Sequence, residues 1–170
     1  MKSLFMKIVL LSAVIALSGC GEEKKAVVSP QQPAVAKVDN FENVTIRLKD
    51  PAFGSVDGIN GVTAPPSGTV IPIADDKIRI GGFAVDAIRG EAAAGVIVLI
   101  DDKPFVAMFG GDRPDIAKAL NNPKYLKSQF YVETPAVSLG KGSHDVKFRV
   151  IASDRSGYYE SAWSAKIDIK

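Results

Sequence analysis

The sequence predicts a mainly β fold, an antiparallel β-sandwich with one short helix around residues 113–121. Seven or eight short runs after residue 40 either alternate apolar and polar side chains or are apolar throughout. Residues that favour turns, mostly glycine, proline, asparagine and aspartate, separate these runs at regular intervals. Only one stretch has a helical pattern. Many short strands joined by such turns are typical of a sandwich.

The first predicted strands are short. Residues 44–48 alternate with period two, and residues 55–61 form a run punctuated by glycine. Residues 77–86 alternate again over ten positions, and the pair Gly81-Gly82 inside them indicates a β-bulge.

Residues 95–100 give the strongest strand signal, because all positions after the first glycine are large and apolar. Such a run suits a central strand covered on both faces. We expect residues 101–104 to form a turn and residues 105–109 to return as the hairpin partner. One face of the central strand is predicted to hold Val96, Val98 and Ile100, and the other Ile97 and Leu99.

The helical segment has several helix-start signals. Asp112 can cap the first turn, Pro114 suits it, and Asp115 lies near the positive end of the helix dipole. Ile116 and Leu120 are four residues apart, so we expect them to share a buried face.

Three more strands are predicted after the helix, at residues 129–132, 144–151 and 162–169. The middle one alternates well and directs Val146, Phe148 and Val150 inward. His144 opens this strand directly after a turn, where exposed polar residues are common.

The N-terminus has the layout of a secretory signal peptide. Two lysines precede an apolar run, Ile8 to Leu17, which is too short to span a bilayer as a helix of roughly twenty residues. The sequence Leu17-Ser18-Gly19-Cys20 closely resembles the lipobox of bacterial lipoproteins. The resemblance implies acylation at Cys20 and cleavage before it. Gly21, in place of the aspartate that favours inner-membrane retention in the enterobacterial rule, indicates the outer membrane.

These features divide the chain into a signal peptide (1–19), a lipid-anchored tether (20–40) and a β-sandwich domain (41–170). The tether is rich in charged residues, glutamine and proline, and such a composition cannot bury enough apolar surface to order itself. Twenty flexible residues reach about 25 Å from the anchor.

Composition excludes several classes of function. Removing Lys2 and Lys7 with the signal peptide leaves 19 basic residues against 19 acidic ones, and the basic residues form no cluster that would track nucleic-acid phosphates. His144 is the only histidine, and Cys20 is the only cysteine and is expected to carry lipid. We therefore expect no nucleic-acid partner, no disulfide, no transition-metal site and no cofactor.

The stretch from Ile80 to Tyr158 resembles a small accessory domain attached to bacterial envelope glycosyltransferases and other exported proteins. The segments that carry the resemblance are Gly82-Phe83-Ala84-Val85-Asp86, Val96 to Lys103, Arg113-Pro114-Asp115-Ile116-Ala117, Gln129-Phe130-Tyr131, Gly142-Ser143-His144 and Asp154-Arg155-Ser156-Gly157. The resemblance implies an Ig-like sandwich with a binding role and no catalysis. It covers about half of the mature chain. Phe83 stands where the family often has tryptophan, and Asp102-Lys103 replaces its usual Asp-Gly turn.

Five residues are candidates for a binding site. Arg113 and Asp115 could hold a polar ligand at the start of the helix; the alternative is a structural corner in which Arg113 pairs with a carboxylate such as Asp86. Trp163, Tyr158 and Tyr159 could stack on sugar rings; alternatively Trp163 belongs to the core. Tyr158 and Tyr159 face opposite ways in a strand, so at least one is expected to be exposed.

A calcium site built from the turn aspartates is the less favoured interpretation, because their spacing matches no compact oxygen-ligand loop. The aspartates concerned are Asp57, Asp101, Asp102, Asp112 and Asp154. Catalysis by His144 is also disfavoured, since no Gly-x-Ser-x-Gly elbow accompanies it.

The sequence therefore predicts a membrane-anchored lipoprotein with a non-catalytic module that binds an envelope protein or a glycan and faces the periplasm or the cell surface. Two alternatives stay open: a structural or assembly lipoprotein of an outer-membrane complex, and a hydrolase of envelope polymers.

Overall fold

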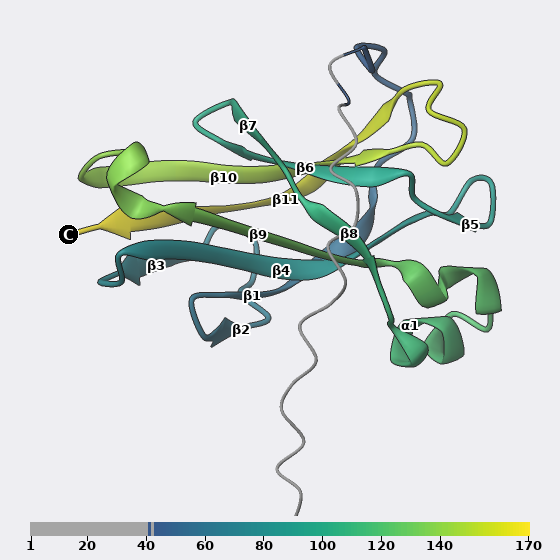
Figure 1. The fold of residues 1–170 in the computed structure, drawn as a ribbon, viewed down its shortest axis with the longest axis horizontal. Helices are drawn as coiled ribbons and strands as arrows, with labels where there is room; N and C mark the ends of the chain where they lie inside the picture. Colours follow the sequence, from purple (N-terminus) through teal and green to yellow (C-terminus); the bar gives the residue numbers. More distant parts are fainter. Residues whose placement is uncertain (1–40, 42) are drawn as a thin grey trace, which may run out of the picture. The chain divides into compact units, whose positions relative to one another are not determined.

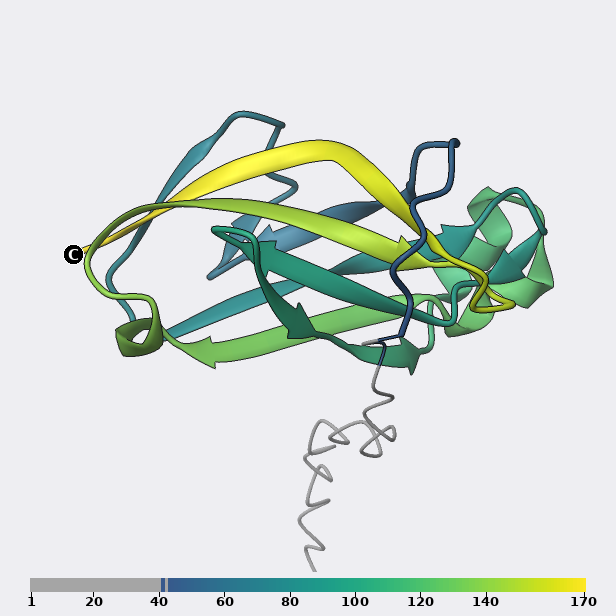
Figure 2. The ribbon, with the colours of Figure 1, turned by 90° about the horizontal axis from the view of Figure 1, so that it is seen from above.

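The computed structural model describes residue 41 and residues 43–170, and it confirms the mainly β sandwich with one short helix. Two sheets pack face to face, and Figure 2 shows the long strands β10 and β11, lime and yellow, in the layer above the green β9. The predicted signal peptide, the tether and Cys20 lie outside the described residues.

The first sheet has the strand order β2-β1-β4-β9-β8, and β5 pairs with β4 beside this path. All of its pairings are antiparallel. Its strands are β1 (Phe53–Ile59), β2 (Val62–Thr63), β4 (Lys77–Asp86), β5 (Glu91–Ala92), β8 (Met108–Gly111) and β9 (Gln129–Pro135).

The second sheet has the strand order β3-β11-β10-β6-β7. Its pairings are antiparallel except for β3, which runs parallel to β11 at one edge. Its strands are β3 (Val70–Ile73), β6 (Gly95–Ile100), β7 (Lys103–Val106), β10 (Gly142–Ile151) and β11 (Tyr158–Ile169).

The hairpin that follows β6 is shorter than the sequence suggests. Asp101 and Asp102 both have positive φ angles, of 49° and 63°, as a two-residue type I′ hairpin turn requires. Only residues 103–106 pair with β6. The chain then crosses at Ala107, which is buried, and β8 joins the opposite sheet. The expectation that residues 105–109 form one hairpin strand is therefore wrong.

A bulge exists beside Gly81-Gly82, but the extra residue is in the neighbouring strand. Val56 pairs with Gly82 and Gly58 with Gly81, so Asp57 of β1 is the additional residue. β4 itself stays regular, and Gly82 faces the core, where a Cβ atom would lie only 2.8 Å from the Phe130 ring. The bulge predicted in β4 thus lies in β1.

The predicted strand at residues 44–48 is also wrong. This segment makes a single parallel bridge, between Arg47 and Tyr158, and the Leu48 N–H donates to the Tyr158 carbonyl at 2.8 Å. Tyr158 of β11 therefore anchors the segment through its backbone, without a continuous ladder.

The core lies between the sheets and follows the predicted alternation. Val96, Val98 and Ile100 of β6 belong to it, and Phe148 of β10 packs against Phe130 of β9 with ring centroids 5.8 Å apart. The predicted inward positions Val146, Phe148 and Val150 are all buried. The two faces of β6 are thus assigned correctly.

The helical region lies at one end of the sandwich, at the right of Figure 1, and η2 lies with the C-terminus at the other. Pro114 starts α1 as predicted, but Asp112 makes no capping hydrogen bond and instead pairs with Lys127 at 2.6 Å. Ile116 and Leu120 are only half-buried, because the rest of the domain covers little of a short helix at the end of a sheet. The helical elements are α1 (Pro114–Ala119) and the 3₁₀ turns η1 (Pro123–Lys127) and η2 (Ala136–Ser138).

We expect Val98→Asp to lower the free energy of unfolding by roughly 3–5 kcal/mol, because it places an unpaired charge in the core. Val98 is 1% exposed. Chemical denaturation followed by circular dichroism measures the change. Val106→Asp in β7, where the side chain is 36% exposed, is the matched control and should cost far less. Equal losses in the two variants would contradict the assigned core.

Candidate functional site

Arg113 lies at a corner where three parts of the chain meet. Its Nε and Nη2 donate to the two carboxylate oxygens of Asp115 at 2.9 and 2.7 Å. Its Nη1 donates to Asp57, the bulge residue of β1, at 2.5 Å, and its guanidinium lies 5.4 Å from the centre of the Phe83 ring. The Arg113 side chain is 15% exposed, and its backbone N–H donates to the Leu126 carbonyl.

These contacts lie within the domain, and they explain why an arginine and an aspartate occupy this corner. The Arg113 guanidinium beside it, more than any other cause, lowers the pKa of Asp115 to about 2. The donors of Arg113 are directed at two carboxylates and its cationic face at a ring. The partner suggested from sequence, Asp86, is not among them, because Asp86 is enclosed by a different set of donors.

Tyr159 belongs to this second set. The carboxylate of Asp86, fully buried in β4, accepts hydrogen bonds from the Tyr159 hydroxyl at 3.0 Å and from the backbone and hydroxyl of Ser153 at 2.9 Å each. Arg89 adds its backbone N–H and Nη1, and its Nη2 reaches Asp154. Burial and the Asp86 carboxylate raise the pKa of Tyr159 to about 12. Tyr159 is thus a buried hydrogen-bond donor rather than a surface ring.

Trp163 and Tyr158 lie elsewhere on the second sheet. Trp163 is half-buried against the core, 6.1 Å from Phe148 between ring centroids, and its Nε1 donates to the Pro65 carbonyl. The Tyr158 ring is half-buried under the guanidinium of Arg149 at 4.4 Å. The two adjacent tyrosines differ in burial, but Tyr158 is only half-buried and Tyr159 is buried, so the expectation that one of them is exposed is wrong. Among the described aromatic residues, only Phe53 is exposed, at 44%.

The sequence candidates are therefore not brought together. Arg113 and Asp115 form one corner, whereas Tyr158, Tyr159 and Trp163 occupy three separate settings in the second sheet.

A polar cluster that the sequence analysis missed lies on the outer face of the first sheet. Glu133 of β9 accepts from Lys77 at 2.6 Å, from Arg79 at 3.2 Å and from the Tyr131 hydroxyl at 3.1 Å. Arg79 also lies 3.5 Å from Asp75. The alternation of residues 77–83 and 129–133 assigns these side chains to one face of each strand. Whether they come into contact depends on the register of β4 against β9, which cannot be read from the sequence.

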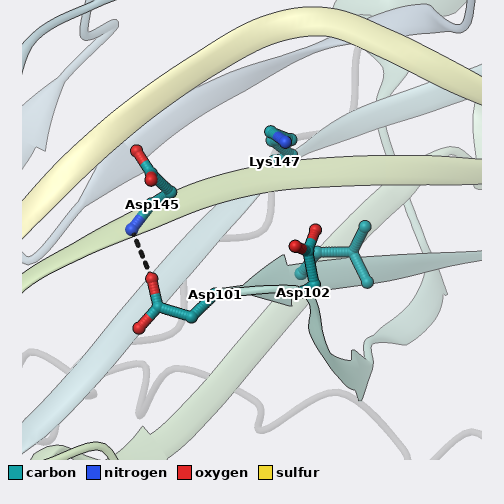
Figure 3. Close-up of a pocket in the computed structure, with 5 residues that line it drawn as sticks. Asp101, Asp102, Asp145 and Lys147 are labelled. Atoms are coloured by element: carbon teal, nitrogen blue, oxygen red, sulfur yellow. Dashed lines mark hydrogen bonds between the residues drawn. The ribbon is translucent and has the colours of Figure 1, made fainter.

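A shallow hollow of about 190 Å³ lies on the second sheet, lined by Leu99, Asp101, Asp102, Asp145 and Lys147. Figure 3 shows Asp101 accepting a hydrogen bond from the backbone N–H of Asp145, at 2.8 Å. The hollow is open, and its carboxylates do not converge on one point.

His144 contacts the rim of this hollow from inside the domain and does not line it. His144 is 7% exposed, which corrects the expected surface position; it lies two residues before Val146 on the same face of β10 and points inward. Its Nδ1 lies 2.6 Å from Asp101 and its Nε2 3.1 Å from the Gly140 carbonyl. The hydrogen bond between His144 and Asp101 is the main cause that lowers the pKa of Asp101. Both ring nitrogens are engaged, so neither is free to act as a base.

The described residues hold no group of three or more carboxylate or histidine side chains that could bind a metal ion. Asp57, Asp112 and Asp154, considered above for calcium, are each paired with an arginine or lysine. That part of the chain also holds no helix that is long and apolar enough to cross a membrane.

Comparisons with known proteins assign neither a family nor an activity to this chain. No family model matches the chain, and no curated protein matches it significantly. Among solved structures, it is similar to the X-ray structure of an endo-β-1,4-mannanase from Thermotoga petrophila, with 10% identity and a TM-score of 0.41 over 72% of this chain. The chain spans 21% of that enzyme, and a likeness this distant carries no argument about activity.

We expect the contribution of Asp115 to stability to depend on pH. Its pKa falls from 3.8 to about 2 on folding, so the ion pair with Arg113 stabilises the fold fully above pH 4 and is lost between pH 4 and 2. Melting temperatures of wild type and Asp115→Asn should differ at pH 7 and converge near pH 2.

Asp112→Asn is the control, because Asp112 and its partner Lys127 are both about 60% exposed. Its effect at pH 7 should be smaller. A wild-type advantage over Asp115→Asn that stays constant from pH 7 to pH 2 would show that the Arg113 pair is not its source.

Proposed function

We propose that this protein is a lipid-anchored bacterial lipoprotein whose β-sandwich is a non-catalytic binding module in the cell envelope. The observation that carries the proposal is the sequence Leu17-Ser18-Gly19-Cys20 after a short apolar run. Acylation of Cys20 would supply the anchor, since burial of acyl chains contributes about 0.8 kcal/mol per CH₂ and two or three chains hold firmly.

The arrangement of the domain is compatible with display from a tether. The sandwich begins with Phe41, which is 6% exposed and packs against Gly95, where a Cβ atom would lie 2.4 Å from the ring. The first described residue is thus fixed to the sandwich. Twenty residues separate it from Cys20, and a flexible chain of that length reaches about 25 Å. Gly21 supports the outer membrane as the destination.

A non-catalytic role fits the described polar groups better than hydrolysis does. A hydrolase of envelope polymers would need a nucleophile with a free base, or paired carboxylates, in a cleft. The carboxylates of the hollow are open to solvent on a sheet surface, and His144 behind them is engaged at both nitrogens. We therefore favour binding over hydrolysis.

Mass spectrometry and membrane fractionation of wild type and Cys20→Ala test the anchor. The wild-type mature chain should begin at Cys20, carry acyl groups and sediment with outer membranes. Cys20→Ala should yield an unprocessed or soluble periplasmic form. Ser29→Ala, a small change in the tether, should behave as wild type. A wild-type mature chain without acyl groups would overturn the proposal.

A further inference from the structure

The outer face of the second sheet has an apolar surface at its β6–β7 edge. Ile97 pairs with Val106, and Leu99 pairs with Pro104. These four side chains alternate with the core residues of β6 and their partners in β7, so they lie on the outer face. Val106 is 36% exposed, and Pro104 is exposed as well. We call these four residues the β6–β7 face. Contiguous apolar surface on the outside of a sheet often marks an interaction site.

Phe41 already covers the neighbouring position on the same face. Gly95 lies two residues before Ile97 in β6 and therefore faces the same way. A Cβ atom at Gly95 would lie 2.4 Å from the Phe41 ring, and Phe41 is 6% exposed. The N-terminal segment thus covers the outer face of β6 as far as Phe41, where the described part of the chain begins.

The chain after Phe41 runs toward the opposite edge of the sheet. Gly95 pairs with Ile151 of β10, and Ile151 pairs with Tyr158 of β11. Arg47 forms its bridge with this same Tyr158. The segment therefore passes from β6 over β10 to β11, away from β7. Followed backward from Phe41, the same path leads over β6 toward β7.

The residues that precede Phe41 match the β6–β7 face in spacing. Val35, Val38 and Phe41 recur at every third position, and Pro33 comes before them. Three residues per turn is the period of a polyproline II helix, which places such side chains on one side. With its rise of about 3.1 Å per residue, Val38 lies about 9 Å from Phe41 and Val35 about 19 Å. The β6–β7 face extends about 7–14 Å from Gly95 along β6, which is within this range.

Charge favours the same placement. The acidic hollow begins beside the β6–β7 face, at Leu99. Of its three aspartates, only Asp102 has no ion-pair partner among the described residues. Lys37 lies between the two valines, about 12 Å from Phe41 along an extended chain. The hollow is then within about one Debye length of the lysine, roughly 10 Å at 0.1 M salt, so its carboxylates attract the ammonium group.

We propose that residues 33–40, the last part of the tether, lie across the β6–β7 face, with Val38 over Ile97 and Val106 and with Lys37 near the acidic hollow. The segment does not order itself alone; the sandwich supplies the apolar surface that its composition lacks. Four side chains are far fewer than the roughly 800 Å² per partner of a stable protein interface requires. A segment already fixed at Phe41 needs much less, because its effective concentration is high.

The contact shortens the free part of the tether. Residues 21–32 remain between the anchor and the sandwich, and a flexible chain of twelve residues reaches about 19 Å instead of about 25 Å. This consequence rests on the proposed lipid anchor at Cys20, whereas the contact itself does not.

Limited trypsin digestion of the full chain in detergent tests the contact, because Lys25 and Lys37 are two cleavage sites in one tether. In wild type, cleavage after Lys37 should be at least about tenfold slower than after Lys25, as followed by mass spectrometry. Val106→Asp should restore cleavage after Lys37, because it places a charge in the apolar contact. Val70→Asp is the control, since Val70 is an exposed valine of β3 at the opposite edge of the same sheet, and it should not.

The melting temperature gives a second measurement with variants in the tether. Val38→Asp should lower it by about 2–4 °C, because the contact with the sandwich is lost. Val28→Asp, the same change outside residues 33–40, should leave it unchanged. Since neither position lies in the sandwich, this comparison holds even where Val106→Asp itself unfolds the domain.

Four results would overturn the proposal. One is equal cleavage after Lys25 and Lys37 in wild type. Another is protection of Lys37 that survives Val106→Asp in a folded domain, which would come from closeness to the sandwich alone. Protection that rises with protein concentration would assign the β6–β7 face to the tether of a second copy. The last is a melting temperature as indifferent to Val38→Asp as to Val28→Asp. Acylation of Cys20 is read separately by mass, so failure of the anchor and failure of this contact are distinguishable.

Discussion

The buried carboxylate of Asp86 ties the two sheets together at one end of the sandwich. It comes from the last residue of β4 in the first sheet, and its partners Ser153 and Tyr159 follow β10 and open β11 in the second. Burial alone would raise its pKa, but the hydrogen bonds that it accepts outweigh burial and lower it. A charge in this position is stable only because its donors are all in place.

This connection has consequences for the neighbouring segments. Arg89 extends it to the β10–β11 turn through Ser156 and Asp154. The segment around Arg47 then pairs with Tyr158 at the start of β11, next to Tyr159. With the interior closed in this way, the polar groups available to a ligand lie on the outer faces. The outer face of the first sheet presents the paired charges of Lys77, Arg79 and Glu133, and that of the second sheet presents the open acidic hollow.

The fold was predictable from sequence wherever one face of a strand is buried. The alternation in residues 77–86 and 144–151 and the apolar run at 95–100 assign the right faces, because period two directs successive side chains to opposite sides. The sequence-based prediction failed where pairing with distant segments determines the local structure. Residues 44–48 alternate but form only one bridge, and the extra residue of the β-bulge is Asp57 in β1 rather than a residue of β4.

The candidate site was harder to predict than the fold. Arg113 and Asp115 meet because they are two residues apart, but Asp57 joins them only through the bulge. Glu133 meets Lys77 and Arg79 through strand register alone. A histidine after a turn looks like a surface residue, and only the partners of His144, Asp101 and the Gly140 carbonyl, explain its burial. Such long-range partners leave no local pattern.

The central structural claim, that the Asp86 carboxylate holds the two sheets together, is tested most directly by the free energy of unfolding of wild type and Asp86→Asn as a function of pH. The asparagine amide would direct a donor at the donors of Ser153 or Tyr159, so we predict a loss of about 2–4 kcal/mol at pH 7. Because the pKa of Asp86 is lowered on folding, this difference should hold above the unfolded pKa of about 3.9 and shrink as the pH falls below it. An Asp86→Asn variant as stable as wild type at pH 7 would contradict the account.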